Sequence, residues 1–221
     1  MSLKAKLLRI GHFGLVADSD GYPVSNGDNW IRAPEAYDIG GVATGLKPVS
    51  FVSSRDVDGT LGTACSTGRG KGVIPYWSQL KPERRRLALE ALRAAKSVGA
   101  LYMPADTKGD GAIVFLPKHF KTAAALHYYM SQETAGIKLS YYIDGLAFGY
   151  ARRDIFAYWA GSEHASKNAG NVVDAAQMKA YKAQFRELTR ATDKAWAATL
   201  KGAAFKKYAE ALRGSVRPVL V

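Results

Sequence analysis

Five basic side chains recur at helical spacing near the end of the sequence. Lys179, Lys182, Arg186, Arg190 and Lys194 follow one another in steps of three, four, four and four residues. Because residues three and four apart share one face of an α-helix, this spacing predicts a continuous cationic strip. Like charges at such spacing repel one another, which favours an anionic partner. The strip therefore predicts binding of nucleic acid or another polyanion through phosphates, with a solvated basic helix face as the alternative.

Other basic residues could extend such a surface. Three consecutive arginines lie on a predicted helix, two basic residues alternate with glycine in the stretch 67–72, and an arginine pair precedes Asp154. These residues are Arg84, Arg85, Arg86, Arg69, Lys71, Arg152 and Arg153. Each phosphate that they neutralise would release counterions and add affinity. The nucleic-acid hypothesis thus expects basic groups that are distant in sequence to meet on one surface.

A pair of carboxylates suggests a different class of function. Asp56 and Asp58 are two residues apart in the string Asp-Val-Asp-Gly-Thr, shortly after the apolar run 49–52. Two carboxylates at this spacing could bind one Mg²⁺ ion, which would organise phosphoryl or nucleotidyl transfer. The alternative is a hairpin turn at Asp58-Gly59, since Asp-Gly is a frequent turn pair.

The same string resembles the opening motif of haloacid-dehalogenase-type phosphatases. In that family the first aspartate is the nucleophile and the second a general acid/base, so the resemblance implies these roles for Asp56 and Asp58. However, Ser53-Ser54-Arg55 stands where the family has an apolar strand, and no downstream acidic pair completes a magnesium site. The sequence is therefore not assigned to this family, and a Mg²⁺-dependent enzyme is kept as the alternative function.

Aromatic side chains concentrate between residues 120 and 159. This stretch contains ten of them, many of them tyrosines, interleaved with Lys138, Arg152 and Arg153. Exposed rings could stack on unpaired bases and add to phosphate binding. The simpler interpretation is a packed core, because most aromatic side chains in folded proteins are buried. A component of an oligomer or larger assembly, such as a viral one, is a third class of function, which the abundance of tyrosine favours.

The composition excludes several classes of protein. Of the 221 residues, 48% are apolar, which is enough for a folded core. The single cysteine, Cys65, can form neither a disulfide within the chain nor a cysteine-rich zinc site. No apolar run reaches the 18 residues of a membrane helix, and the first residues lack the apolar segment of a secretory signal. These features predict a protein without a membrane span and with a cytoplasmic location.

The positive charge is unevenly distributed along the chain. There are 31 basic and 19 acidic side chains, which give a net charge of +12. Residues 1–60 have a net charge of −1, whereas residues 61–160 have +7 and residues 161–221 have +6. The N-terminal segment is therefore not expected to contribute to a polyanion-binding surface.

The elements that must position these residues differ between the two parts of the chain. Residues 1–77 are rich in glycine and in turn pairs such as Asp20-Gly21, with short apolar runs between them. These runs lie at 7–16, 49–52, 61–65 and 72–76. Short apolar runs separated by Asp-Gly or Asn-Gly predict strands joined by hairpins, so this subregion is expected to be β-rich.

Residues 78–221 favour helices. The spacing predicts helices over 82–98, over 118–132, from Asp174 onward and again after Gly202, and strands over 101–103 and 112–116. The segment 140–150 fits either a helix or a strand, and Asp154 resembles an N-cap. The sequence thus predicts one α+β domain over residues 1–221, with a β-hairpin-rich N-terminal part packed against a mainly helical C-terminal part.

Overall fold

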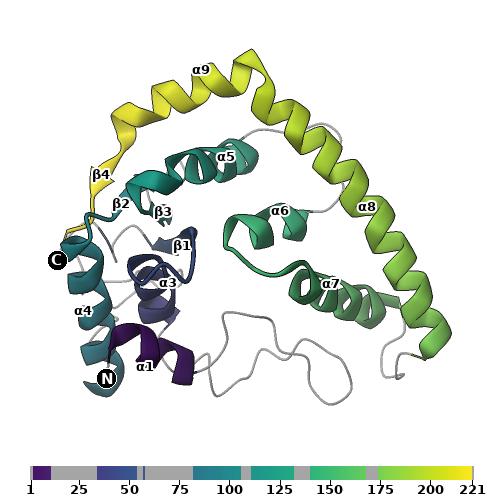
Figure 1. The fold of residues 1–221 in the computed structure, drawn as a ribbon, viewed down its shortest axis with the longest axis horizontal. Coiled ribbons are helices and arrows are strands. Elements are labelled where there is room, and N and C mark those ends of the chain that lie inside the picture. Colours follow the sequence, from purple (N-terminus) through teal and green to yellow (C-terminus); the bar gives the residue numbers. More distant parts are fainter. Residues whose placement is uncertain are drawn as a thin grey trace, which may run out of the picture.

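Helices surround a small sheet in an α+β arrangement (Figure 1). The computed structural model describes residues 2–10, 34–53, 57, 82–105, 111–131, 140–167 and 174–220. In chain order the elements are α1 (Leu3–Ile10), α3 (Pro34–Ala43), β1 (Val49–Ser53), α4 (Pro82–Ser97), β2 (Leu101–Pro104), β3 (Gly111–Phe115), η3 (Pro117–His119), α5 (Phe120–Ser131), α6 (Ser140–Ala147), α7 (Arg152–Lys167), α8 (Ala175–Lys201), α9 (Ala203–Leu212), η4 (Arg213–Ser215) and β4 (Arg217–Pro218).

The strands form one antiparallel sheet in the order β1-β3-β2-β4. Phe115 of β3 pairs with Val49 of β1 on one side and with Leu101 of β2 on the other. The short strand β4 closes the edge beside β2, and the backbone N–H of Val219, just after it, donates to the carbonyl of Ala100 at 3.1 Å. Since Val219 is itself buried in the core, the end of the chain is part of the sheet's packing.

Helices cover both faces of the sheet, so the central strand β3 is buried at every position. Val114 shares one core with Ile39 of α3 and Leu92 of α4. Ile113, its neighbour in the strand, points to the other face and shares a second core with Leu126 of α5. This alternation follows from the two-residue period of a strand, and it accounts for the unbroken apolar sequence of β3.

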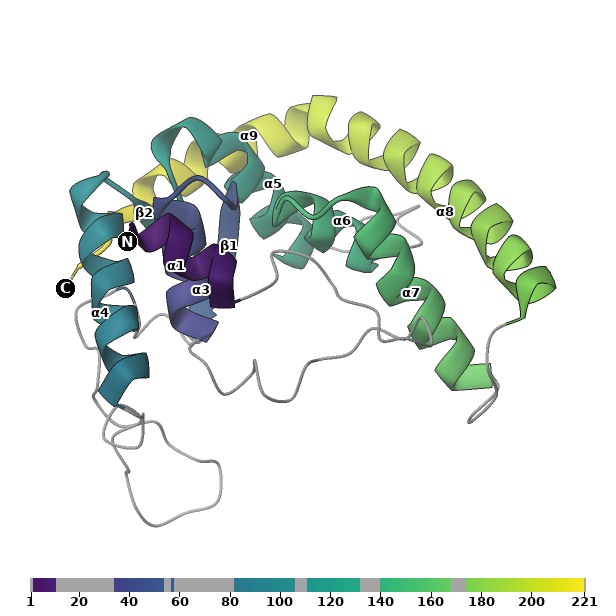
Figure 2. The ribbon, with the colours of Figure 1, turned by 60° about the horizontal axis from the view of Figure 1, so that its bottom comes forward.

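The helices α6, α7 and α8 build a third core beside the sheet. Tyr142 of α6, Ile155 of α7 and Phe185 of α8 are all buried there. The 27-residue helix α8 runs along the end of the molecule opposite α4, as Figures 1 and 2 both show. Its successor α9 packs on α5 through Phe205, which returns the chain to the sheet.

Local sequence signals set the ends of two helices as expected. Asp174 begins α8 with a capping box, in which its carboxylate accepts the Gln177 N–H at 2.7 Å and the Gln177 side chain accepts the Asp174 N–H at 3.0 Å. Gly99 ends α4 in the left-handed region at φ +67°, where glycine is favoured because it has no Cβ. The helices after Pro82, Asp174 and Gly202 are thus confirmed.

The strands over 49–52, 101–103 and 112–116 and the helix over 118–132 are confirmed as well. The strand expected over 7–16 is wrong for its first residues, because Leu3–Ile10 form helix α1. Leu3 and Leu7 lie one helical turn apart, and Leu7 is fully buried close to Gly40 of α3. Helix α3 also lies in the part of the chain that was expected to be β-rich. The runs 61–65 and 72–76 fall outside the described residues.

Two further expectations are resolved between α5 and α8. The segment 140–150, which fitted either a helix or a strand, contains helix α6, and Tyr142 and Ile143 of this helix are buried. Asp154 is not an N-cap: α7 begins at Arg152, so this carboxylate lies inside the first turn, where it still interacts favourably with the helix dipole. Among the described helices, none combines the length and hydrophobicity needed to cross a membrane.

Candidate functional site

The five basic residues of α8 lie on its solvent-facing side. Lys179, Lys182, Arg186, Arg190 and Lys194, which we name the α8 strip, are all exposed. The other side of the helix buries Tyr181 and Phe185 against α6 and α7. A rise of about 1.5 Å per residue makes the strip about 22 Å long. None of the five side chains forms an ion pair with another residue of the described ranges.

The carboxylate of Asp193, although close to the strip in sequence, is engaged elsewhere. It accepts a hydrogen bond from the hydroxyl of Tyr142 at 2.9 Å and another from the guanidinium of Arg152 at 3.1 Å. Burial, followed by the hydrogen bond to Asp193, raises the pKa of Tyr142 to about 12. Arg152 also lies over the Tyr142 ring, 5.5 Å from its centroid. Asp193 therefore joins α8 to α6 and α7 and does not neutralise the strip.

Of the other basic residues singled out in the sequence, the structure describes the side chains of Arg86, Arg152 and Arg153, and Arg152 contacts α8 through Asp193. Arg153 is exposed beside Asp154, at 3.4 Å. Arg86 is exposed on α4, which lies at the opposite end of the molecule from α8 in both Figure 1 and Figure 2, so the structure does not bring it to the α8 strip. Arg84 and Arg85 belong to the first turns of the same helix, and their side chains are outside the described part. Arg69, Lys71, Asp56 and Asp58 also lie outside the described residues.

The aromatic residues of 120–159 mostly serve the core. Tyr142 and Trp159 are buried, and Phe156 packs on Phe185 with ring centroids 5.2 Å apart. His127 links three elements: its Nε2 atom donates to the carbonyl of Pro104 at 2.8 Å, and its Nδ1 atom is hydrogen-bonded to the Tyr208 hydroxyl at 2.7 Å. These contacts hold α5 to β2 and α9, as expected for a packed histidine.

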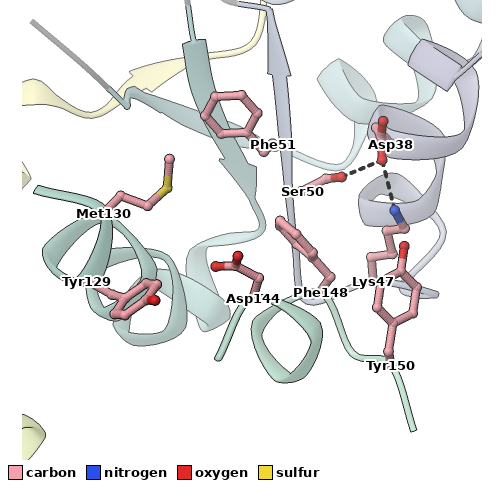
Figure 3. Close-up of a pocket in the computed structure, with 9 residues that line it drawn as sticks. All are labelled: Asp38, Lys47, Ser50, Phe51, Tyr129, Met130, Asp144, Phe148 and Tyr150. Atoms are coloured by element: carbon pink, nitrogen blue, oxygen red, sulfur yellow. Dashed lines mark hydrogen bonds and ion pairs between the residues drawn. The ribbon is translucent and has the colours of Figure 1, made fainter. Parts of the chain in front are cut away.

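A pocket of about 450 Å³ opens between the sheet and the helices α5 and α6 (Figure 3). Its lining comes from α3 and the turn after it (Asp38, Lys47), β1 (Ser50, Phe51), α5 (Tyr129, Met130), and α6 with its following turn (Asp144, Phe148, Tyr150). We name it the aromatic pocket, because four of these side chains carry aromatic rings. Its volume is in the range of small-molecule sites.

One side of the aromatic pocket is an ion pair between Lys47, which is buried, and Asp38, which is partly exposed. The Oδ1 atom of Asp38 accepts hydrogen bonds from Nζ of Lys47 at 2.8 Å and from Oγ of Ser50 at 2.7 Å. Burial by itself would lower the pKa of Lys47, but Asp38 and Tyr150 outweigh it through charge and hydrogen bonding, so the pKa lies above its ordinary value. Lys47 is therefore protonated at neutral pH, and its charge is matched by that of Asp38.

This arrangement argues against nucleophilic catalysis by Ser50. A lysine that activates a serine must be deprotonated in order to accept its proton, and Lys47 holds its own proton more strongly than usual. The Ser50 hydroxyl is directed to Asp38 and is almost completely buried. The three side chains thus form a satisfied polar support, which fixes the turn between α3 and β1.

Two glycines allow aromatic rings to form the walls. Gly149 ends α6 at φ +81°, with the N–H of Tyr150 donating to the carbonyl of Gly145 at 2.8 Å. This turn places the rings of Phe148 and Tyr150 around the Lys47 ammonium, at 5.9 and 5.6 Å from their centroids. On β3, which pairs with β1, a Cβ at Gly111 would lie 2.5 Å from the tip of the Phe51 ring, so any larger residue there would require that ring to move.

Asp144 is a second acidic residue of the aromatic pocket, in addition to Asp38 of the ion pair. It is half-buried on α6, and its carboxylate has no hydrogen-bond or ion-pair partner among the described residues. Burial raises the pKa of this carboxyl. In Figure 3 the carboxylate points toward the side of the pocket formed by Tyr129 and Met130, away from Lys47. The pocket therefore has a net negative charge when Asp144 is ionised, within a protein whose net charge is +12.

Tyr129, Phe148 and Tyr150 of the aromatic pocket belong to the aromatic stretch 120–159, but no sequence motif contains its polar residues Asp38, Lys47, Ser50 and Asp144. One signal was present: Asp144 is the single charged residue in the otherwise apolar and aromatic helix sequence SYYIDGLA. A carboxylate among apolar residues is seldom left without a partner or a role. In the described ranges, no three His, Cys, Asp or Glu side chains are close enough to hold a metal ion.

Comparison with known proteins adds no family. No family model matches the chain, and neither the curated proteins nor the solved structures give a significant match. The features that bear on the function are therefore the exposed cations of the α8 strip and the cavity of the aromatic pocket.

Proposed function

We propose that this chain binds nucleic acid through its phosphates, along the solvent-facing side of α8. The observation that supports the proposal is the α8 strip: five exposed cations on one helix face, without a carboxylate partner among the described residues. Cations that are not paired within the protein keep their attraction for an external polyanion. The Asp193 carboxylate is paired with Arg152, whose positive charge offsets its effect on the strip.

The spacing of the strip suits repeated contacts with phosphates. Each step of four residues advances about 6 Å along the helix axis. Every phosphate that is neutralised releases counterions, so several such contacts give an affinity that falls steeply with salt. Contacts of this kind position a nucleic acid without reading its bases, and we expect little sequence preference.

The test is binding of a fluorescent oligonucleotide, followed by anisotropy at several salt concentrations. The triple variant Lys182→Gln, Arg186→Gln, Arg190→Gln should bind more weakly at every salt concentration. Its slope of log affinity against log salt should be shallower by about two, since each phosphate contact contributes about 0.7 to 0.9. A matched control, Arg86→Gln, Arg93→Gln, Lys96→Gln, removes the same charge from exposed positions of α4.

Four outcomes would overturn the proposal. The first is no binding at low salt, and the second is a salt slope that is unchanged in the α8 variant. The third is an equal loss in the α4 control, which would assign the effect to net charge and not to the strip. Preference for heparin over both single-stranded and double-stranded oligonucleotides would contradict nucleic acid as the partner.

A further inference from the structure

We propose that the aromatic pocket binds a small organic cation, an ammonium group on an aryl or alkyl body, with the Asp144 carboxylate as its counter-ion. This site is separate from the α8 strip, which lies on the solvent-facing side of another helix. The proposal is therefore independent of the proposed nucleic-acid binding. Three features of the pocket carry it: its charge, its walls and its opening.

The charge of the pocket selects the sign of the ligand. Lys47 and Asp38 neutralise each other at 2.8 Å, and Ser50 completes the pair. Asp144 then remains as a carboxylate whose acceptor positions are free among the described residues. An anionic ligand would add a second negative charge beside it, whereas a ligand with N–H donors would satisfy it.

The walls of the pocket suit a cation with an apolar body. The rings of Phe51, Tyr129 and Phe148 line the same cavity as the Asp144 carboxylate (Figure 3). Aromatic faces attract organic cations and also cover their apolar parts. The Lys47 ammonium, which lies within 6 Å of the Phe148 and Tyr150 ring centroids, already shows this contact inside the protein.

The opening of the pocket is apolar and accessible. Phe51 and Met130, from β1 and α5, keep 41% and 45% of their surface exposed although both are large hydrophobic residues. Large apolar side chains left in water beside a cavity are typical of ligand-binding sites. They give the body of the ligand a surface to bury, while its ammonium group reaches Asp144.

The experiment uses phenethylamine as the probe, with phenethyl alcohol as its neutral counterpart and 3-phenylpropionate as its anionic one. Binding to the full chain is followed by NMR on the methionine methyl groups. There are four methionines, and Met130 is the one among the described residues that lines the pocket, so its signal, assigned with Met130→Leu, reports the site. Phenethylamine should shift the Met130 methyl signal and leave that of Met178 on α8 unchanged.

Asp144→Asn should weaken phenethylamine binding about ten-fold and make it similar to that of the alcohol. Glu187→Gln, on the exposed side of α8, removes the same charge far from the pocket and should have no effect. Phe51→Ala, at the opening, should also weaken binding. An excess of Mg²⁺ should not compete, because the pocket offers one unpaired carboxylate and not a set of oxygen ligands.

The proposal would be overturned if the alcohol or the acid bound as well as the amine, or if the Met130 signal did not move. Unchanged amine affinity in Asp144→Asn, or complete competition by Mg²⁺, would do the same. If Asp144→Asn did not fold, the comparison of the three probes on the unmodified chain would still decide. Loss of oligonucleotide binding in the α8 variants would not affect any of these results.

Discussion

The hydroxyl of Tyr142 donates a 2.9 Å hydrogen bond to the carboxylate of Asp193, and this contact ties the short helix α6 to the long helix α8. The tyrosine is fully buried, whereas the aspartate is partly exposed and also accepts from Arg152. The same carboxylate thus satisfies a buried hydroxyl and a surface guanidinium. The stability of this junction should depend on the protonation of Tyr142.

Tyr142→Phe should lower the free energy of unfolding at neutral pH by about 1 to 2 kcal/mol, the usual contribution of a hydrogen bond to a charged group. Because the folded-state pKa of about 12 is above the unfolded value near 10, the tyrosine's contribution is complete below pH 10 and is lost as the pH rises toward 12. Urea unfolding at pH 8, 10 and 11 should therefore show a shrinking difference between the two proteins. A difference that is constant with pH would contradict this assignment.

Asp38→Asn should destabilise the fold by about 2 to 3 kcal/mol, because it leaves the buried Lys47 charge without its partner, and Lys47→Met should cost less, because the Asp38 side chain is 28% exposed. The double variant should recover part of this loss, and the coupling in a double-mutant cycle measures the pair. The pKa of Lys47 is raised, so its stabilising effect is present below its ordinary value of 10.5 and is lost as the pH rises through the raised value. Additive losses in the cycle would argue against the pair.

Gly149→Ala should destabilise the protein by about 2 kcal/mol. A Cβ at this position would lie 2.7 Å from Cδ of Pro48, and φ of +81° is unfavourable for alanine. Gly45→Ala separates the effect of the positive φ from that of the close contact, because φ of Gly45 is +72° but no atom lies within 4 Å of the added Cβ. This variant should lose about 1 kcal/mol of unfolding free energy. Gly214→Ala has neither problem and should change little. Thermal unfolding of the three variants should follow this order, and equal losses in all three would be inconsistent with it.

Thr192→Val should leave the stability unchanged or raise it by up to about 1 kcal/mol. The Thr192 hydroxyl is buried in α8 and has no hydrogen-bond partner among the described residues, so its removal should cost no interaction and relieve the penalty of burying it. Thr189→Val is the matched control, since the buried Thr189 hydroxyl donates to the carbonyl of Arg186 at 3.2 Å. The measurement is the urea midpoint. A larger loss for Thr192→Val than for Thr189→Val would show that the Thr192 hydroxyl does have a partner.

The parts of the fold that could be predicted from the sequence are those with local signals. Asp174 and Gln177 mark the start of α8 by their spacing alone, and Gly99 marks the end of α4. The exposed position of the α8 strip also follows from local periodicity, whereas its binding to nucleic acid stays a prediction. By contrast, the apolar run 7–16 predicts a strand although its first residues belong to α1, because the contact that buries Leu7 against α3 spans a long stretch of chain.

The aromatic pocket could not be predicted, since its groups come from separate parts of the chain. Asp38 and Asp144 are 106 positions apart, and neither belongs to a motif. A lysine in a turn is normally exposed, and Lys47 is buried beside Asp38 only because of the way the chain folds. The distance of Arg86 from the α8 strip could not be predicted for a similar reason, because it depends on how α5, α6 and α9 pack between α4 and α8.

The strand β4 also has a consequence for biosynthesis. The edge of β2 stays open on the nascent polypeptide until residues 217–219 have been translated, because those residues supply the strand and the buried Val219. An open edge is a template for pairing with other chains. We therefore expect slow translation of the last helices to promote aggregation, and a chaperone that covers this edge to increase the yield of native protein.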